Sequence, residues 1–190
     1  RGLGLTMWRP TGSLAFLKAR AQLTFEVRAF FEKRGVLEVD TPLLGWAPVT
    51  DPYLDAFSVE GLGATRYLQT SPEYAMKRLL AAGSGSIYQL GKAFRKDELG
   101  RYHLPEFTML EWYRLKMTDW DLMNEVDDLL QQVLKTPGAT RISYQDAFLQ
   151  ALGFNPHTAS LSELQSSVKK VLEEVSGLPI SDRDTCLQLL

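Results

Sequence analysis

Two strand-like runs joined by a charged loop constrain the fold of this 190-residue chain more than any other feature. The runs cover Ile87 to Arg95 and Glu106 to Leu115, and the stretch between them contains Gly100. The pattern of each run is typical of a strand, whereas the charged connection is typical of an exposed loop. We therefore predict two antiparallel strands with a long tip between them.

Further strand and helix signals surround this pair. Ser13 is a good N-cap for a long amphipathic helix that Gly35 ends. A strand is predicted from Val36 to Thr41, and a hairpin is predicted from Leu54 to Glu60 and Arg66 to Gln69. The other helices are predicted to begin at Ser71, after Thr118, near Ser143 and near Ser162. This order predicts an α+β domain built on an antiparallel sheet flanked by helices.

Two of these helices carry detailed expectations. Ser71-Pro72-Glu73 is a compact helix start, with a hydroxyl cap, a proline at the first helical position and a carboxylate near the positive end of the dipole. The apolar stripe predicted for the helix after Thr118 consists of Met123, Val126, Leu130 and Val133.

Composition limits what the chain can be. With 45% hydrophobic residues, 190 residues bury one good core but are short for two domains, so a single unit is predicted over residues 1–190. The 21 basic and 23 acidic residues nearly cancel, which excludes a basic field over the whole surface. The single cysteine, Cys186, excludes an internal disulfide and is expected to be a buried hydrophobe. No apolar run has membrane-spanning length, so we expect no membrane partner and a cytoplasmic location.

The two ends of the sequence carry their own expectations. Residues 1–6 are predicted to be a leader, non-native or disordered, because Arg1 is not an initiator and Met7 is the more plausible start. The apolar helical pattern from Asp182 to Leu190 stops without a cap or a polar tail, so we expect the chain to be cut there.

Strand alternation in the second run predicts a ligand-binding face. Phe107, Met109, Glu111 and Tyr113 share one face of the strand. Phe107 and Glu111 are about 13 Å apart at about 3.3 Å per residue, which matches the length of an aminoacyl-adenylate. A base stacked on Phe107 would leave an ammonium group near Glu111 and Tyr113, and Arg95 could reach the phosphate between them.

These residues lie within motifs of a known family. GVLEVDTPLL, from Gly35 to Leu44, resembles motif 1 of the class II aminoacyl-tRNA synthetases, and Phe94 to Tyr113 resembles motif 2 in its lysine-specific form. TSPEY, from Thr70 to Tyr74, also resembles the lysyl branch. GRYH, PEFTMLEWYR and MNEVDDLLQQVL resemble the elongation factor P lysine ligases. That family is a lysyl-tRNA synthetase paralogue that lacks the anticodon-binding domain and uses (R)-β-lysine, and the resemblance runs from about Trp8 to Leu190.

The resemblance implies a role for each motif position. Substrate-binding positions are Ser71, Pro72, Glu73, Glu111 and Tyr113, of which the last two contact the distal amine. ATP-binding positions are Arg95, Lys96, Asp97, His103, Leu104 and Phe107. Arg95 is the implied catalytic residue, because in-line attack on the α-phosphate concentrates negative charge that a guanidinium stabilises. Phe107 is implied to stack on adenine, and His103 to lie near the outer phosphates.

Three positions depart from the family pattern. Lys96 stands where the family usually has Asn, Asp97 where it has Glu, and Leu104 where an Asn contacts ATP. Motif 3, the second ATP-binding arginine and the acidic Mg²⁺ ligands are expected beyond Leu190, so the sheet is expected to be truncated before motif 3, without the C-terminal third of the domain. The residues of this chain therefore supply no predicted metal ligand.

The resemblance implies an ATP-dependent ligase that joins lysine or (R)-β-lysine to a lysine of elongation factor P. Motif 1 implies a homodimer, and the missing anticodon-binding domain argues against tRNA as a partner. Two alternatives stay open. The chain could be the catalytic domain of a lysyl-tRNA synthetase, or a truncated, non-catalytic paralogue that only dimerises or binds a partner. The departures at Asp97 and Leu104 favour the second alternative.

Overall fold

The computed structural model describes residues 10–61, 63–96, 98–172 and 180–190. The chain divides into two compact units, residues 1–138 and residues 139–190. The leader expected at residues 1–6 lies outside the described residues. The prediction of one catalytic domain over 1–190 stays a prediction.

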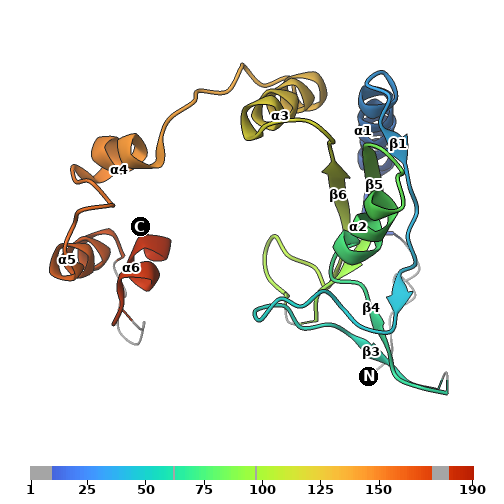
Figure 1. Cartoon of the computed structure of the whole chain (residues 1–190), viewed down its shortest axis with the longest axis horizontal. Coiled ribbons are helices and arrows are strands. Elements are labelled where there is room, and N and C mark those ends of the chain that lie inside the picture. The colour runs from blue at the N-terminus through green and yellow to red at the C-terminus, as the bar shows by residue number, and fades with distance from the viewer. Residues whose placement is uncertain (1–9, 62, 97, 173–179) are drawn as a thin grey trace. The chain divides into compact units, whose positions relative to one another are not determined.

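The first unit contains three helices and two small sheets among its described residues (Figure 1). The helices are α1 (Leu14–Glu32), α2 (Glu73–Ala81) and α3 (Asp119–Leu134). One sheet has the order β1-β5-β6, formed by β1 (Leu37–Glu38), β5 (Ile87–Phe94) and β6 (Glu106–Tyr113). The other has the order β2-β4-β3, formed by β2 (Leu44–Gly45), β3 (Ser58–Val59) and β4 (Arg66–Leu68).

The predicted pair of strands is confirmed, and its register fixes which side chains share a face. β5 and β6 are antiparallel, with Ala93 opposite Phe107 and Gln89 opposite Glu111. Figure 1 shows the two strands side by side. The hairpin predicted from Leu54 to Glu60 and Arg66 to Gln69 is also present, with shorter strands, as β3 paired with β4.

One face of the β5–β6 hairpin packs on the core of the unit. Phe30 and Phe31 of α1 are fully buried, and the Phe31 ring stacks on Tyr88 with 4.4 Å between the ring centroids. Leu110 and Trp112 of β6 pack against the same cluster. Helix α1 forms where the sequence predicts it, because the Ser13 hydroxyl accepts the backbone N–H of Phe16 at 3.1 Å.

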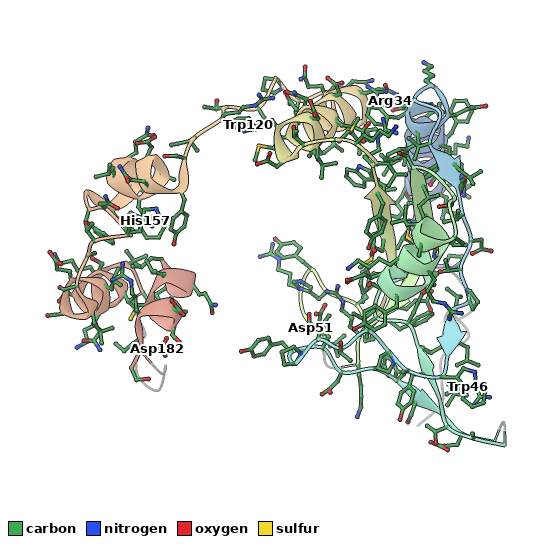
Figure 2. The ribbon with its side chains drawn as sticks, in the orientation of Figure 1. Arg34, Trp46, Asp51, Trp120, His157 and Asp182 are labelled. Carbon is green, nitrogen blue, oxygen red and sulfur yellow. The ribbon has the colours of Figure 1, made fainter. Side chains whose placement is uncertain are left out.

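A buried carboxylate joins α3 to this face. Glu125 is only 4% exposed and accepts a hydrogen bond from the indole N–H of Trp112 at 3.1 Å. The Nε atom of Arg114 lies 3.0 Å from the same carboxylate. Arg34 follows α1 and is labelled in Figure 2. It approaches Glu125 at 3.9 Å and donates to Asp128 of α3. These contacts hold two helices against one face of the sheet.

The second unit is a small helical cluster. It contains α4 (Tyr144–Leu152), α5 (Leu161–Val171) and α6 (Arg183–Leu189). Side-chain oxygens of Ser143, Ser160 and Asp182 cap the three N-termini, and Asp182 is labelled in Figure 2. Leu164, Val168 and Cys186 form the core, so the predicted burial of Cys186 is confirmed. Helix α5 begins at Leu161, close to the predicted start near Ser162, and α6 lies within the helical pattern predicted from Asp182 to Leu190.

The α+β fold class is confirmed, with four corrections to its elements. The β1-β5-β6 sheet is mixed, because β1 is parallel to β5, and β1 is shorter than the strand predicted from Val36 to Thr41. Pro72 occupies the N-cap position of α2, and the helix begins one residue later, at Glu73. The buried residues of α3 are Glu125 and Leu129, whereas Met123 and Leu130 of the predicted stripe are 49% and 40% exposed.

Candidate active site

The other face of the β5–β6 hairpin carries the residues predicted to bind an aminoacyl-adenylate. Phe107, Glu111 and Tyr113 alternate along β6 on the face opposite to Leu110 and Trp112. Arg95 follows β5, and its backbone N–H donates to the carbonyl of Pro105 at 2.9 Å. This bond extends the ladder by one residue and places Arg95 on the Phe107 side.

Arg95 lies close to Phe107, as the predicted phosphate site requires. Its Cζ atom is 5.1 Å from the centroid of the Phe107 ring. One guanidinium nitrogen, Nη1, donates to Glu98 at 3.3 Å. The Nε atom is buried and has no hydrogen-bond partner among the described residues. A buried guanidinium N–H without an acceptor is costly, and an oxyanion beside Phe107 would satisfy it.

Glu111 and Tyr113 form a hydrogen-bonded pair farther along the same face. The Tyr113 hydroxyl donates to Glu111 Oε1 at 2.8 Å. Burial raises the pKa of Glu111, and the charge of Glu73 raises it further, whereas the Tyr113 bond and Lys77 act in the opposite direction. Burial and the Glu111 carboxylate raise the pKa of Tyr113, which therefore stays a neutral donor. An incoming cation would relieve the cost of ionising Glu111.

Glu73 begins α2 and supplies a second carboxylate to this region. Its backbone N–H donates to the Ser71 hydroxyl at 3.3 Å. Lys77 donates to the Glu73 carboxylate at 2.5 Å across one helical turn. Because the charge of Glu73 acts on both Glu111 and Tyr113, the three groups lie in one electrostatic environment. Ser71 also lines a hollow of about 540 Å³ with Gln69 and Tyr74.

The residues of the connecting loop are less closely engaged. Lys96, His103 and Leu104 are exposed, and their side chains make no hydrogen bond or ion pair to another described residue. The backbones of Gly100 and His103 bond to each other in both directions, and both residues line a hollow of about 310 Å³ with Glu98. Asp97 lies outside the described residues. The structure thus brings together Arg95, Phe107, Glu111, Tyr113 and the start of α2, but not the three exposed loop side chains.

Sequence reasoning missed a buried polar cluster beneath this face. Thr41, Gln69, Thr70 and Gln89 are each at most 9% exposed. The backbone N–H of Thr41 donates to Gln89 Oε1 at 3.0 Å, and Gln69 Nε2 donates to the carbonyl of Lys92 at 2.7 Å. The signal was a glutamine in the otherwise apolar start of β5, on the same face as Glu111.

Two general features of the described residues bear on cofactors and membranes. No group of three or more His, Cys, Asp or Glu side chains in this part of the chain is arranged to hold a metal ion. Within the same residues, no helix combines the length and the hydrophobicity that crossing a bilayer requires.

Comparison with known proteins gives the class of protein. Residues 5–176 match the family of class II tRNA synthetases for D, K and N. The chain therefore belongs to this class II synthetase family.

Relatives within that class are more specific. The chain is 52% identical over 190 residues to an elongation factor P–(R)-β-lysine ligase from Photorhabdus laumondii, covering 96% of this chain and 58% of the relative. It is 50% identical over 191 residues to the protein of the same name from Vibrio parahaemolyticus, covering 97% and 59%. A third such ligase, from Yersinia pestis, is 51% identical over 190 residues, covering 96% and 58%. The chain thus spans somewhat less than three-fifths of the length of these relatives.

Proposed function

We propose that the complete protein activates a lysine-type amino acid, (R)-β-lysine in particular, with ATP and transfers it to a lysine of elongation factor P. The observation that carries the proposal is the shared face of Arg95, Phe107 and Glu111. It places an unpaired guanidinium N–H beside an aromatic ring, with an acid and a phenol farther along the strand. The names of the relatives support the choice of amino acid and acceptor.

In the proposed first step, a carboxylate oxygen of the amino acid attacks the α-phosphorus of ATP. The bond to the bridging oxygen breaks, and pyrophosphate leaves with its electron pair. Arg95 stabilises the charge that develops on the α-phosphate, while Phe107 holds the adenine ring. Glu111, Tyr113 and Glu73 bind the ammonium groups and orient the carboxylate. The family uses Mg²⁺ to neutralise phosphate charge, but the described residues offer no metal ligand set.

In the proposed second step, the neutral amine of an acceptor lysine attacks the carbonyl carbon of the mixed anhydride. An amide bond forms, the bond to the phosphate oxygen breaks, and AMP leaves. The amine loses one proton to solvent. The anhydride supplies the driving force, so the protein needs chiefly to position the acceptor.

We also propose a homodimer, the cytoplasm as its location, and ATP as the co-substrate. Exposed apolar side chains on α1 support an interface, because five of them are 41–76% exposed: Leu14, Phe16, Leu17, Leu23 and Phe25. Light scattering of the complete protein tests the dimer, and a monomer at micromolar concentration would contradict it.

The central test is ATP–pyrophosphate exchange by the complete protein with L-lysine and with both enantiomers of β-lysine. We expect exchange with (R)-β-lysine, and we expect Arg95→Ala to lower its rate by about 10²–10³-fold because a transition-state donor is lost. Arg28→Ala is the matched control, since Arg28 pairs with Glu38 on α1 and β1 at 3.0 Å. If none of the three amino acids supported exchange, the proposal would be defeated.

The non-catalytic alternative remains worth testing because Leu104 is 63% exposed and apolar in a loop assigned to ATP. It predicts a folded protein that binds its partner without exchanging pyrophosphate. The lysyl-tRNA synthetase alternative predicts transfer to tRNA. Supplying tRNA and elongation factor P to the same activated protein therefore separates a synthetase from an elongation factor P ligase.

A further inference from the structure

Gln89 is a buried side chain with one end of its amide unpaired. It is 3% exposed, and its Oε1 accepts the backbone N–H of Thr41 at 3.0 Å. This bond identifies Nε2 as the other end of the amide and gives it two N–H groups to donate. Nε2 has no hydrogen-bond partner among the described residues. A buried amide donor in this state costs stability unless an acceptor binds to it.

The position of this nitrogen can be located along the strand. Gln89 lies opposite Glu111, Gly91 lies opposite Met109, and Ala93 lies opposite Phe107. A Cβ atom built on Gly91 would lie 3.0 Å from Gln89 Nε2. The amide therefore extends from the Glu111 level toward the Phe107 level, over a residue that has no side chain. Along the strand direction, its nitrogen lies between the level of the acid and the level of the aromatic ring.

The chemistry of that position defines the group that Nε2 can bind. In the proposed function, the ammonium end lies at Glu111 and the adenine lies at Phe107, so the carboxyl group of the amino acid lies between them. An amide N–H donates only, and it therefore suits a carboxylate oxygen or the carbonyl oxygen of an adenylate. An ammonium group would leave it unsatisfied.

We propose that Gln89 is a substrate-binding residue whose amide N–H groups bind the carboxyl group of the amino acid. This inference rests on the proposed function. It adds the Gln89 amide to the Arg95 guanidinium as a second hydrogen-bond donor in the site. The Thr41 bond holds the amide in the orientation that presents Nε2 to the substrate. Gln89 thereby selects amino acids over diamines that have the same ammonium groups.

The test compares ligands with and without the carboxyl group. Calorimetry on the complete protein measures binding of lysine against 1,5-diaminopentane, and of (R)-β-lysine against 1,4-diaminopentane. Gln89→Glu keeps an oxygen for the Thr41 N–H but replaces the donor nitrogen with a carboxylate oxygen. We expect amino-acid affinity to fall at least about tenfold, as for a lost hydrogen bond to a charged group, while diamine affinity stays the same or rises.

Two further variants keep the test decisive. Gln89→Met removes both amide atoms and should show the same ligand-selective loss if Gln89→Glu does not fold. Gln69→Glu is the matched control in the same buried cluster, since its Nε2 already donates to the Lys92 carbonyl. We expect it to affect stability without discriminating between the paired ligands.

The outcomes separate this inference from the proposed function. An equal loss of amino acid and diamine, or no loss of either, would assign Gln89 a purely structural role and overturn the inference alone. The same selective loss in Gln69→Glu would also overturn it. A wild-type protein that binds none of these ligands would overturn the proposed function and this inference together.

Discussion

The two faces of the β5–β6 hairpin both bury polar side chains, but they satisfy these groups to different degrees. On the α1 and α3 side, Glu125 is 4% exposed and has Trp112, Arg114 and Arg34 around its carboxylate. Arg114 Nε is also buried without a hydrogen bond among the described residues, but it has a charged partner, because it lies 3.0 Å from the Glu125 carboxylate. On the other side, Gln89 Nε2 and Arg95 Nε are buried without a hydrogen-bond partner in the described residues.

This contrast separates the polar groups that stabilise the fold from those that a ligand would satisfy. A buried charge surrounded by its partners is costly to disrupt but needs nothing from outside. A buried donor without an acceptor lowers stability in the free protein, and its cost is removed when a ligand supplies the acceptor. The first face should therefore respond to mutation in stability, and the second face in binding.

The largest effect is expected from breaking the satisfied face. Glu125→Leu leaves Arg114 and Arg34 without their shared carboxylate, so the free energy of unfolding should fall by about 3–5 kcal/mol. Denaturant unfolding of the complete protein measures this change. Asp128→Asn is the control, because Asp128 is 60% exposed and its pair with Arg34 should contribute less than about 1 kcal/mol. Equal destabilisation by the two variants would contradict the distinction drawn between the faces.

A smaller effect, on binding instead of stability, is expected at Glu111. Burial raises the pKa of this carboxyl, so its ionised form is less favourable in the fold than in the unfolded chain. Its stabilising contribution is therefore present at low pH and is lost as pH rises through the raised pKa. Removing the charge with Glu111→Gln should leave the free energy of unfolding at pH 7 within about 0.5 kcal/mol of the wild type or slightly higher.

Ligand binding has the opposite pH dependence. An ammonium group needs the ionised carboxylate, so wild-type affinity should fall on acidification at a pH above the ordinary glutamate value. Glu111→Gln should lower affinity at pH 7 about tenfold or more and flatten this profile. Calorimetry between pH 5 and pH 8 measures both. Glu106→Gln, on the opposite face and paired with Lys92, should leave the profile unchanged. A profile in Glu111→Gln as steep as the wild type would remove Glu111 from the amine site.

Local alternation was enough to predict the shared face, because a strand of eight residues places every second side chain on the same side. The register of β5 and β6 confirms that arrangement for Phe107, Glu111 and Tyr113. The assigned roles of these residues stay predictions. The helix predicted after Thr118 is confirmed as α3, and Val133 of its predicted stripe packs against the core. The burial of Glu125 was missed because partners distant in sequence decide it. An apolar stripe gives no signal for a carboxylate that Arg114 and Trp112 surround.

Other features depended on contacts that a single segment does not encode. The pairing of β2 with β4 involves only two residues of β2, too few for a detectable strand pattern. The polar cluster of Thr41, Gln69 and Gln89 joins three segments of the chain. Gln89 itself was visible as a polar residue in β5, but its unpaired nitrogen follows from the position of Thr41 in space.

The smallest effect is expected at Lys77, which has a partner within the protein but also lies in the proposed ligand site. Its ammonium group already pairs with Glu73, but both side chains are partly exposed, at 56% and 35%. An exposed pair contributes little to stability, so Lys77→Met should leave the unfolding midpoint nearly unchanged. In the proposed site, however, Lys77 competes with a substrate ammonium group for the Glu73 carboxylate. Amino-acid affinity should therefore rise by no more than a few-fold.

Lys92→Met supplies the comparison for this last variant, because Lys92 pairs with Glu106 at 2.7 Å on the opposite face. It removes the same charge from the protein and should leave amino-acid affinity unchanged at moderate ionic strength. A rise in both variants would indicate a general effect of net charge. Weaker binding in Lys77→Met alone would mean that Lys77 orients Glu73 for the substrate. The Glu73–Lys77 pair would then resemble the Glu125 cluster, in which the protein itself supplies the partner of each charge.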